Sequence, residues 1–178
     1  MKNQTRDISS FSASHSSGPR NHLLVLAINQ YTEHPVLSNA VGDAQAIVNM
    51  LTRRFDFEAD EGIKALYNER GTREEFYKAL LEYQRTLTRE DTLLIWFSGH
   101  GAYKPDTESG YWVPVNASKG ESAALDWIDF DWLLKQLTGI RAGHIALIAD
   151  SCHSGAALLG VAAGGVRKKE KLPDPWIL

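Results

Sequence analysis

Four short, continuous apolar runs recur along this sequence and constrain its fold more than any other feature. They occupy residues 22–29, 62–67, 91–97 and 144–149. Runs of this length without polar alternation are typical of strands that are buried on both faces, as in a parallel sheet. Each run is far shorter than the about 20 apolar residues that a membrane-spanning helix needs, so we expect no membrane segment.

Helical patterns separate these runs. Apolar residues recur at helical spacing over 44–51, 76–87 and 130–137, and Thr72 with Glu75 forms a capping box ahead of the second stripe. Residues 103–115 contain Gly, Pro and aromatic residues, which indicates an irregular excursion or a small hairpin. The order β-α-β-α-β-loop-α-β predicts an α/β fold with a mainly parallel sheet and helices on both faces.

Composition limits the class of protein further. The 178 residues carry a formal charge of -3, which argues against nucleic acid or an anionic membrane as partner. The single cysteine excludes a disulfide scaffold and is compatible with a cytoplasmic location. We expect a flexible leader over 1–20, one domain over 21–163, and a linker or C-terminal tail over 164–178.

Two polar turns follow the third and fourth runs of the predicted sheet. Ser98-Gly-His-Gly101 comes after the third run, and Asp150-Ser-Cys-His-Ser-Gly155 comes after the fourth. Ligands of parallel sheets bind beyond the carboxyl ends of the strands. If the two strands are neighbours, about 5 Å apart, His100 and Cys152 face each other at this edge.

This pairing permits nucleophilic catalysis. His100 is able to take the thiol proton of Cys152, and the N–H groups of Gly101 and Cys152 are able to form an oxyanion hole for amide or ester hydrolysis. A buried packing cysteine is the alternative for Cys152, and His153 is a rival base. Zinc binding is disfavoured because the chain has one cysteine and no closely spaced histidine pair.

The two turns resemble the catalytic motifs of the metacaspases, prokaryotic type, within the caspase-like cysteine peptidases. The spacing of 52 residues from His100 to Cys152 is near the roughly 50 of caspases. Residues 24–29, 42–44 and 111–114 also resemble family landmarks, and the likeness covers about residues 22–160. The resemblance implies a caspase–haemoglobinase fold and a cysteine endopeptidase that cuts proteins by a Cys–His dyad.

The resemblance also implies cleavage after Arg or Lys in an acidic first pocket. Asp150 matches the family's pocket acid and Asp43 a second one, while Ser98 and Ser151 occupy positions that line the same pocket. A helix N-terminal residue that interacts with the dipole is the alternative for Asp43. A carboxylate pair offers two parallel hydrogen bonds to a guanidinium, so we expect Arg to be favoured over Lys.

The sequence departs from the family at two places. Calcium-dependent members carry acidic residues where this chain has Asn116 and Ala117, so we expect no cofactor and no calcium requirement. Family members also continue beyond the second motif with a small-subunit region. We therefore expect either the large-subunit part of a longer or cleaved protein, with that region or a regulatory partner beside it, or a reduced form.

Arg167, Lys168 and Lys169 follow a Gly-Gly pair and match the expected specificity, so we expect a self-processing site there; a solvated basic linker is the alternative. Two other functions stay open. One is a caspase-like peptidase of the CHAT type that a partner activates, and the other is a catalytically weak regulatory or interaction domain.

Overall fold

A five-stranded parallel sheet forms the centre of the computed structural model, which describes residues 18–58, 62–119, 125–151 and 176–177. The strand order is β2-β1-β3-β7-β8. The strands are β1 (Asn21–Ala27), β2 (Ile63–Tyr67), β3 (Thr92–Gly99), β7 (His144–Ser151) and β8 (Trp176–Ile177). The four predicted runs are therefore the four neighbouring strands β2, β1, β3 and β7, as a parallel sheet buried on its faces requires.

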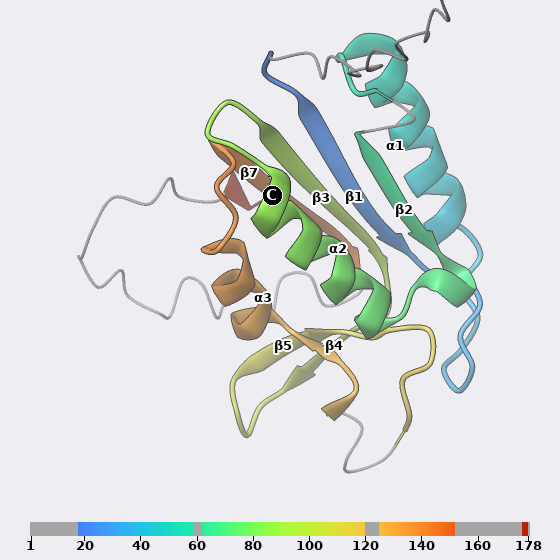
Figure 1. Ribbon diagram of the computed structural model, residues 1–178. Helices are drawn as coiled ribbons and strands as arrows, with labels where there is room; N and C mark the ends of the chain where they lie inside the picture. The colour runs from blue at the N-terminus through green and yellow to red at the C-terminus, as the bar shows by residue number, and fades with distance from the viewer. Residues whose placement is uncertain (1–17, 59–61, 120–124, 152–175, 178) are drawn as a thin grey trace, which may run out of the picture.

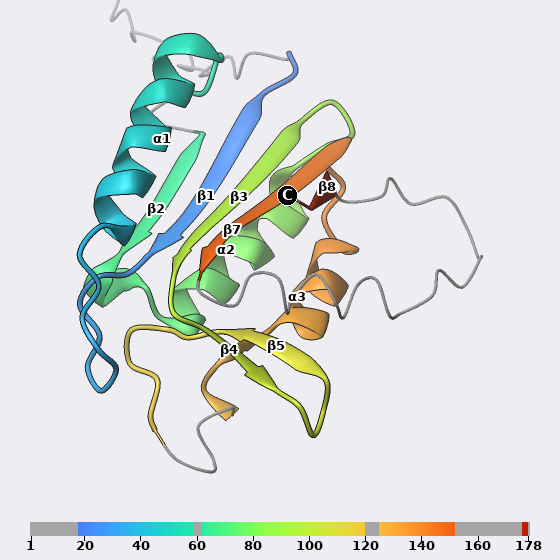
Figure 2. The same cartoon turned by 180° about the vertical axis from the view of Figure 1, so that it is seen from behind.

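Helices cover both faces of this sheet. The helix α1 (Ala40–Arg54) packs on one face, while α2 (Arg73–Thr86) and α3 (Phe130–Leu137) pack on the other. Figure 1 shows α2 and α3 in front of the strands, and Figure 2 shows the opposite face with α1. The predicted α/β fold is confirmed.

Local signals set the helix ends. The hydroxyl oxygen of Thr72 accepts a hydrogen bond from the Glu75 N–H at 3.1 Å, which caps α2 as the sequence predicts. Asp129 caps α3 in the same way, because its carboxylate accepts from the Trp132 N–H at 2.8 Å. A short 3-10 helix, η1 (Asn68–Arg70), joins β2 to α2.

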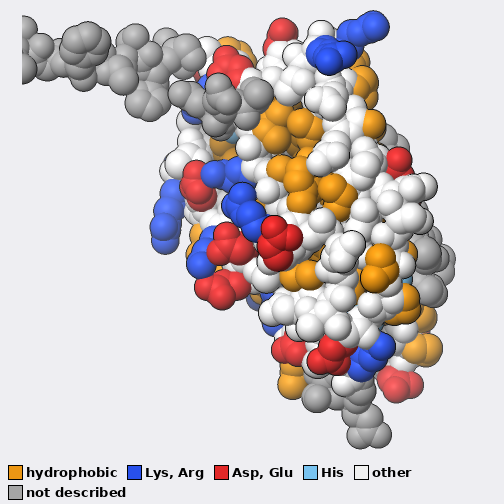
Figure 3. All heavy atoms as spheres, turned by 90° about the vertical axis from the view of Figure 1, so that its right-hand side faces the viewer, with side chains coloured by type: hydrophobic (Ala, Val, Ile, Leu, Met, Phe, Trp, Pro, Cys, Tyr) orange, Lys and Arg blue, Asp and Glu red, His pale blue; other side chains and the backbone are white. Residues whose placement is uncertain are grey.

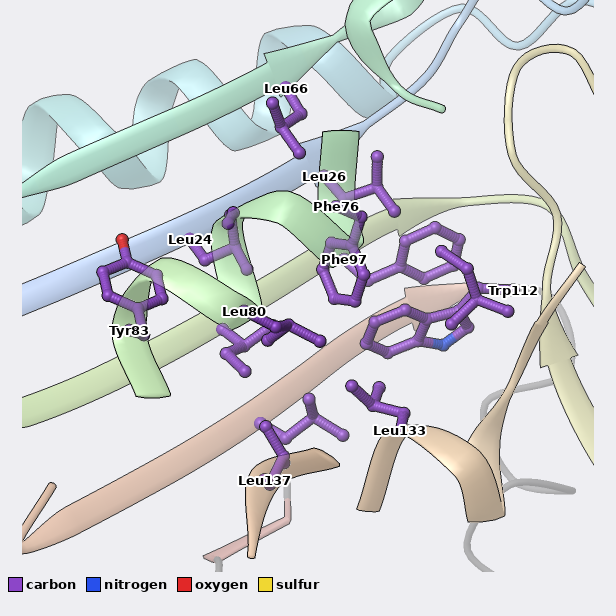
Figure 4. Packing of buried hydrophobic residues seen from close by; sticks show 14 of the residues in the cluster. Leu24, Leu26, Leu66, Phe76, Leu80, Tyr83, Phe97, Trp112, Leu133 and Leu137 are labelled. Carbon is purple, nitrogen blue, oxygen red and sulfur yellow. The ribbon is translucent and has the colours of Figure 1, made fainter. Parts of the chain in front are cut away.

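The stretch between β3 and α3 forms a second, smaller sheet. The strands β4 (Gly101–Lys104) and β5 (Ser109–Trp112) make the predicted hairpin, and β6 (Ile128–Asp129) pairs with β5. Trp112 of this hairpin stacks on Phe97 of β3 with ring centroids 4.3 Å apart and meets Phe76 of α2 edge-on. Figure 4 shows these rings inside the main core, which fixes the hairpin to the end of β3.

The edge strand β2 lies on the side of the molecule that Figure 3 shows, where charged side chains of both signs stand close together beside hydrophobic ones. Lys64 of β2 forms an ion pair with Glu82 at 2.8 Å. A lysine on an edge strand disfavours pairing with another chain. Within the described ranges, no helix is both long and apolar enough to cross a membrane.

At the other side of the sheet, β8 pairs with β7 in parallel register. Its two residues lie within 164–178, for which the sequence predicts a linker or C-terminal tail, and they add a fifth strand to the sheet. The proposed leader, residues 1–20, lies almost wholly outside the described residues.

Candidate active site

The carboxyl ends of β3 and β7 meet at one edge of the sheet. Ser98 pairs with Asp150, and Gly99 pairs with Ser151 in the last rung of the ladder. His100 and Cys152 are the residues that follow this rung in the sequence. Neighbouring strands lie about 4.8 Å apart, so the register brings Ser98 and Gly99 of the first motif next to Asp150 and Ser151 of the second.

The imidazole of His100 contacts the loop between β1 and α1. Its Nε2 atom lies 2.7 Å from the carbonyl oxygen of Pro35. Because a carbonyl oxygen only accepts hydrogen bonds, Nε2 carries the proton in this contact. The neutral ring then has its lone pair on Nδ1, which is the nitrogen that is able to take a proton from a thiol.

Ser98 and Asp150 lie side by side next to this histidine. The Ser98 hydroxyl donates to Asp150 Oδ2 at 3.5 Å; the serine is buried, whereas the aspartate is exposed. Ser151 is half-buried and directly follows them on β7. An exposed carboxylate with a serine beside it, at the edge that holds His100, is suited to binding a cationic side chain.

Asp43 lies in the first turn of α1 and is exposed. That helix packs on the sheet face to which Leu94 and Trp96 of β3 belong. Alternate residues of a strand share one face, so Ser98 belongs to this face as well. Asp43 is therefore on the same side of the sheet as Ser98 and Asp150. No hydrogen bond or ion pair joins it to either of them within the described part of the chain.

Gly101 begins β4, where it pairs with Trp112 and is half-buried. The other expected residues of the site lie outside the described residues: Cys152, His153 and the basic residues 167–169. Among the described side chains, no group of three or more His, Cys, Asp and Glu residues is placed to hold a metal ion. Asn116 is exposed and Ala117 is buried.

Aromatic side chains that motif analysis did not predict gather beside His100. Its ring lies 4.7 Å from the ring of Tyr31 and 6.2 Å from that of His34, which in turn meets Trp127 at 6.4 Å between centroids. Tyr31 and His34 belong to the same loop as Pro35. The only sequence signal for them is their position, directly after the first strand of a parallel sheet, where ligand-binding loops occur.

A second titratable cluster lies at the amino end of the sheet. His22 of β1 is buried, and its Nε2 atom is 3.9 Å from Oδ1 of Asp91, which is also buried. Burial lowers the pKa of His22, and the opposing charge of Asp91 does not outweigh this effect. Burial also raises the pKa of the Asp91 carboxyl, but hydrogen bonds from Thr88 and Arg20 lower it by more. The cluster is therefore at the opposite end of β1 and β3 from His100.

Known proteins resemble this chain in sequence and in fold. The chain is 27% identical over 158 residues to Metacaspase-1 of Meyerozyma guilliermondii, an alignment that covers 83% of this chain and 38% of that protein. The crystal structure of protein GSU0716 from Geobacter sulfurreducens has a similar fold, with a TM-score of 0.61 and 19% sequence identity. That likeness covers 75% of this chain and 51% of the other. The chain thus spans 38% and 51% of the lengths of these two proteins.

The family itself follows from a match over most of the chain. The sequence model of the caspase domain, peptidase family C14, matches residues 20–174, which include residues 98–101 and 150–155 and every strand from β1 to β7. The predicted resemblance is confirmed, and the chain belongs to the caspase domain family of cysteine peptidases.

Proposed function

We propose that this chain is the catalytic part of a cysteine endopeptidase that hydrolyses protein peptide bonds after Arg, and less readily after Lys. The register of β3 and β7 carries the proposal, because Gly99 and Ser151 form a rung directly before His100 and Cys152. Family membership supplies the reaction class, and the residues at this edge supply the roles below.

The dyad would act through Nδ1 of His100. Its Nε2–H is held by Pro35, so Nδ1 takes the proton of the Cys152 thiol and the thiolate attacks the scissile carbonyl carbon. The backbone N–H groups of Gly101 and Cys152 would stabilise the resulting oxyanion. His100 then returns the proton to the leaving amine. Water, deprotonated by the same imidazole, hydrolyses the acyl-enzyme and frees the thiol.

Specificity would come from the carboxylate of Asp150. Ser98 donates to one of its oxygens, which limits the orientations of the group. The other oxygen is left to a substrate guanidinium or ammonium group, and Ser151 lies next to it on the same strand. Asp43, whose helix packs on the same side of the sheet, would be a second acid. Two acids favour Arg, because its planar fork binds both carboxylates while Lys presents a point charge.

Labelling of the single cysteine tests this function directly. The full chain is incubated with matched peptidyl chloromethyl ketones that end in Arg, Lys or Asp, and the modified residue is located by mass spectrometry. We expect labelling of Cys152 in the order Arg, Lys, Asp. Iodoacetamide, which needs no recognition, is the control for thiol access. If iodoacetamide modifies Cys152 but the Arg chloromethyl ketone does not, the result would favour a regulatory domain or a partner-activated peptidase.

We also propose self-processing at Arg167, Lys168 or Lys169. These residues follow Gly164-Gly165 and match the specificity inferred from Asp150. Terminal sequencing of fragments from the chain and from its Cys152→Ala variant tests the idea. Cuts within residues 164–171 that need Cys152 support it. An active enzyme that leaves this stretch intact contradicts it without affecting the proposed dyad.

A further inference from the structure

Tyr31 contacts His100 through both its hydroxyl and its ring. The hydroxyl oxygen accepts a hydrogen bond from the His100 backbone N–H at 2.8 Å. The two rings are tilted against each other with centroids 4.7 Å apart. The tyrosine is only 8% exposed, so the interaction is largely shielded from water. A hydrogen bond of this kind fixes the backbone from which the imidazole projects.

The glycine before His100 makes room for this hydroxyl. A Cβ atom at Gly99 would lie 2.5 Å from Tyr31 Oη, closer than real Cβ contacts occur. The first glycine of the Ser-Gly-His-Gly turn is therefore matched to the tyrosine of a loop that is distant in sequence. The pair of residues couples the end of β3 to the loop between β1 and α1.

Neighbouring contacts hold Tyr31 in place. The side-chain oxygen of Asn68 accepts hydrogen bonds from the N–H groups of Asn29 and Gln30, at 2.9 and 3.2 Å. Asn68 itself has a positive φ of 44°, a conformation that asparagine tolerates better than most residues. On the other side of Tyr31, the Thr32 N–H donates to Val115 O at 2.9 Å. The tyrosine is thus anchored on both sides.

The phenol stays neutral over the pH range in which a thiol peptidase works. Burial raises the pKa of Tyr31 well above its usual value, and the hydrogen bond from His100 opposes this effect only in part. A neutral phenol oxygen accepts from the His100 N–H without placing a negative charge beside the imidazole. Ionisation of the phenol therefore does not disturb this contact in that range.

We propose that Tyr31 is a positioning residue for the His100 imidazole. Its hydroxyl holds the backbone of His100 and its ring restricts imidazole rotation, while Pro35, four residues further along the same loop, binds Nε2. The loop thereby holds the histidine at two points and keeps Nδ1 directed to one place. This inference rests on the proposed function, in which Nδ1 of His100 accepts the proton of Cys152.

The variant Tyr31→Phe tests the inference, because it removes the hydroxyl and keeps the ring. Tyr83→Phe is the matched control: Tyr83 is also buried, and its hydroxyl donates to the backbone oxygen of Leu23, away from His100. We expect Tyr31→Phe to lower kcat on an Arg peptide roughly tenfold, a fraction of the 10²–10⁴-fold that a positioned acid–base group contributes, with KM unchanged. Tyr83→Phe should leave kcat as in the parent.

Nitrogen NMR of the His100 imidazole gives a readout that needs no peptidase activity. In the parent we expect the single tautomer protonated at Nε2, in Tyr83→Phe the same tautomer, and in Tyr31→Phe a mixture. A double-mutant cycle adds a test of the contact itself. Gly99→Ala should destabilise the parent more than it destabilises Tyr31→Phe, in which the oxygen that collides with the new methyl group is absent.

The outcomes separate the two proposals. A parent chain that cleaves peptides, with Tyr31→Phe matching it in kcat and tautomer, overturns the positioning role and leaves the peptidase intact. A parent that cleaves nothing, with a tautomer shift confined to Tyr31→Phe, overturns the peptidase and supports the positioning role. Equal losses of kcat in Tyr31→Phe and Tyr83→Phe would show a general effect on the fold and would also overturn the inference.

Discussion

The Nε2 atom of His100 donates a hydrogen bond to the carbonyl oxygen of Pro35 at 2.7 Å. The two residues are 65 positions apart, and the contact joins the carboxyl end of β3 to the loop after β1. It decides which nitrogen of the imidazole is free. Every chemical role that we propose for His100 follows from the lone pair that this contact leaves on Nδ1.

We predict that Cys152→Ala abolishes peptidase activity and that His100→Ala lowers kcat by about 10²–10⁴-fold, the usual contribution of a general base. His153→Ala should cost less than the lower end of that range, because adjacent residues after a strand usually point apart. Steady-state kinetics on an Arg peptide measures all three. A severe loss in His153→Ala combined with a mild one in His100→Ala would make His153 the base.

We predict that Asp150→Asn lowers kcat/KM for Arg peptides by about 10- to 100-fold, as expected when a hydrogen bond to a charged group worth about 1.5–3 kcal/mol is lost. Ser98→Ala should have a smaller effect, because its bond to Asp150 is long at 3.5 Å. Asp131→Asn, on the exposed side of α3, is the charge-matched control. Cleavage of peptide libraries, followed by mass spectrometry, measures which residue the enzyme prefers before the scissile bond.

Each outcome in the library bears on a different residue. Cleavage confined to sites after Asp would overturn the acidic pocket as a whole. An Arg preference that persists in Asp43→Ala would remove only Asp43 from the pocket. An Arg preference that persists in Asp150→Asn would show that a group other than Asp150 binds the substrate cation.

The fold was predictable because its determinants are local. The helix at 130–137 and the cap at Thr72 appear where the apolar spacing and the capping box place them. The strands β3 and β7 each extend two residues past the predicted runs, because Ser98 and Gly99 continue the ladder although they are not apolar, whereas β1 ends two residues before its run does. Parallel order followed from the alternation of strands and helices. The sequence left open whether the third and fourth strands are neighbours, and the ladder between β3 and β7 meets that condition.

The surroundings of His100 were not predictable for a different reason. Tyr31 and Pro35 lie in a polar loop without periodicity, and their contacts depend on the path of that loop across the end of β3. The pairing of β6 with the hairpin likewise rests on two residues, too few to form a pattern. Contacts between single side chains that are distant in sequence do not produce a periodic pattern of residues, so the sequence does not predict them.

We predict that peptidase activity does not require calcium. Calcium takes six to eight oxygen ligands, largely from carboxylates, and the positions where calcium-dependent relatives carry acids hold Asn116 and the buried Ala117. Activity in a chelator should equal that in millimolar-range calcium, with magnesium as the ionic-strength control. A large rise that calcium produces and magnesium does not would contradict this prediction.

We predict that the free energy of unfolding falls as the pH is lowered below about 6.5, the ordinary pKa of histidine, because of His22. Burial of the ring lowers its pKa in the folded protein, so between the folded and unfolded pKa values the unfolded chain binds more protons. Stability is therefore lost as the pH falls through that window. One such group contributes at most about 1.4 kcal/mol per pH unit.

Urea unfolding at pH 7.5 and 5.5 measures this effect, since the second value lies above the range in which Asp91, with its lowered pKa, would titrate. His22→Phe keeps a ring of similar size and should show a smaller loss of stability between the two pH values than the parent. His144→Ala, at an exposed position at the start of β7, should behave as the parent does. Identical pH dependence in His22→Phe and the parent would exclude His22 as the source of the acid sensitivity.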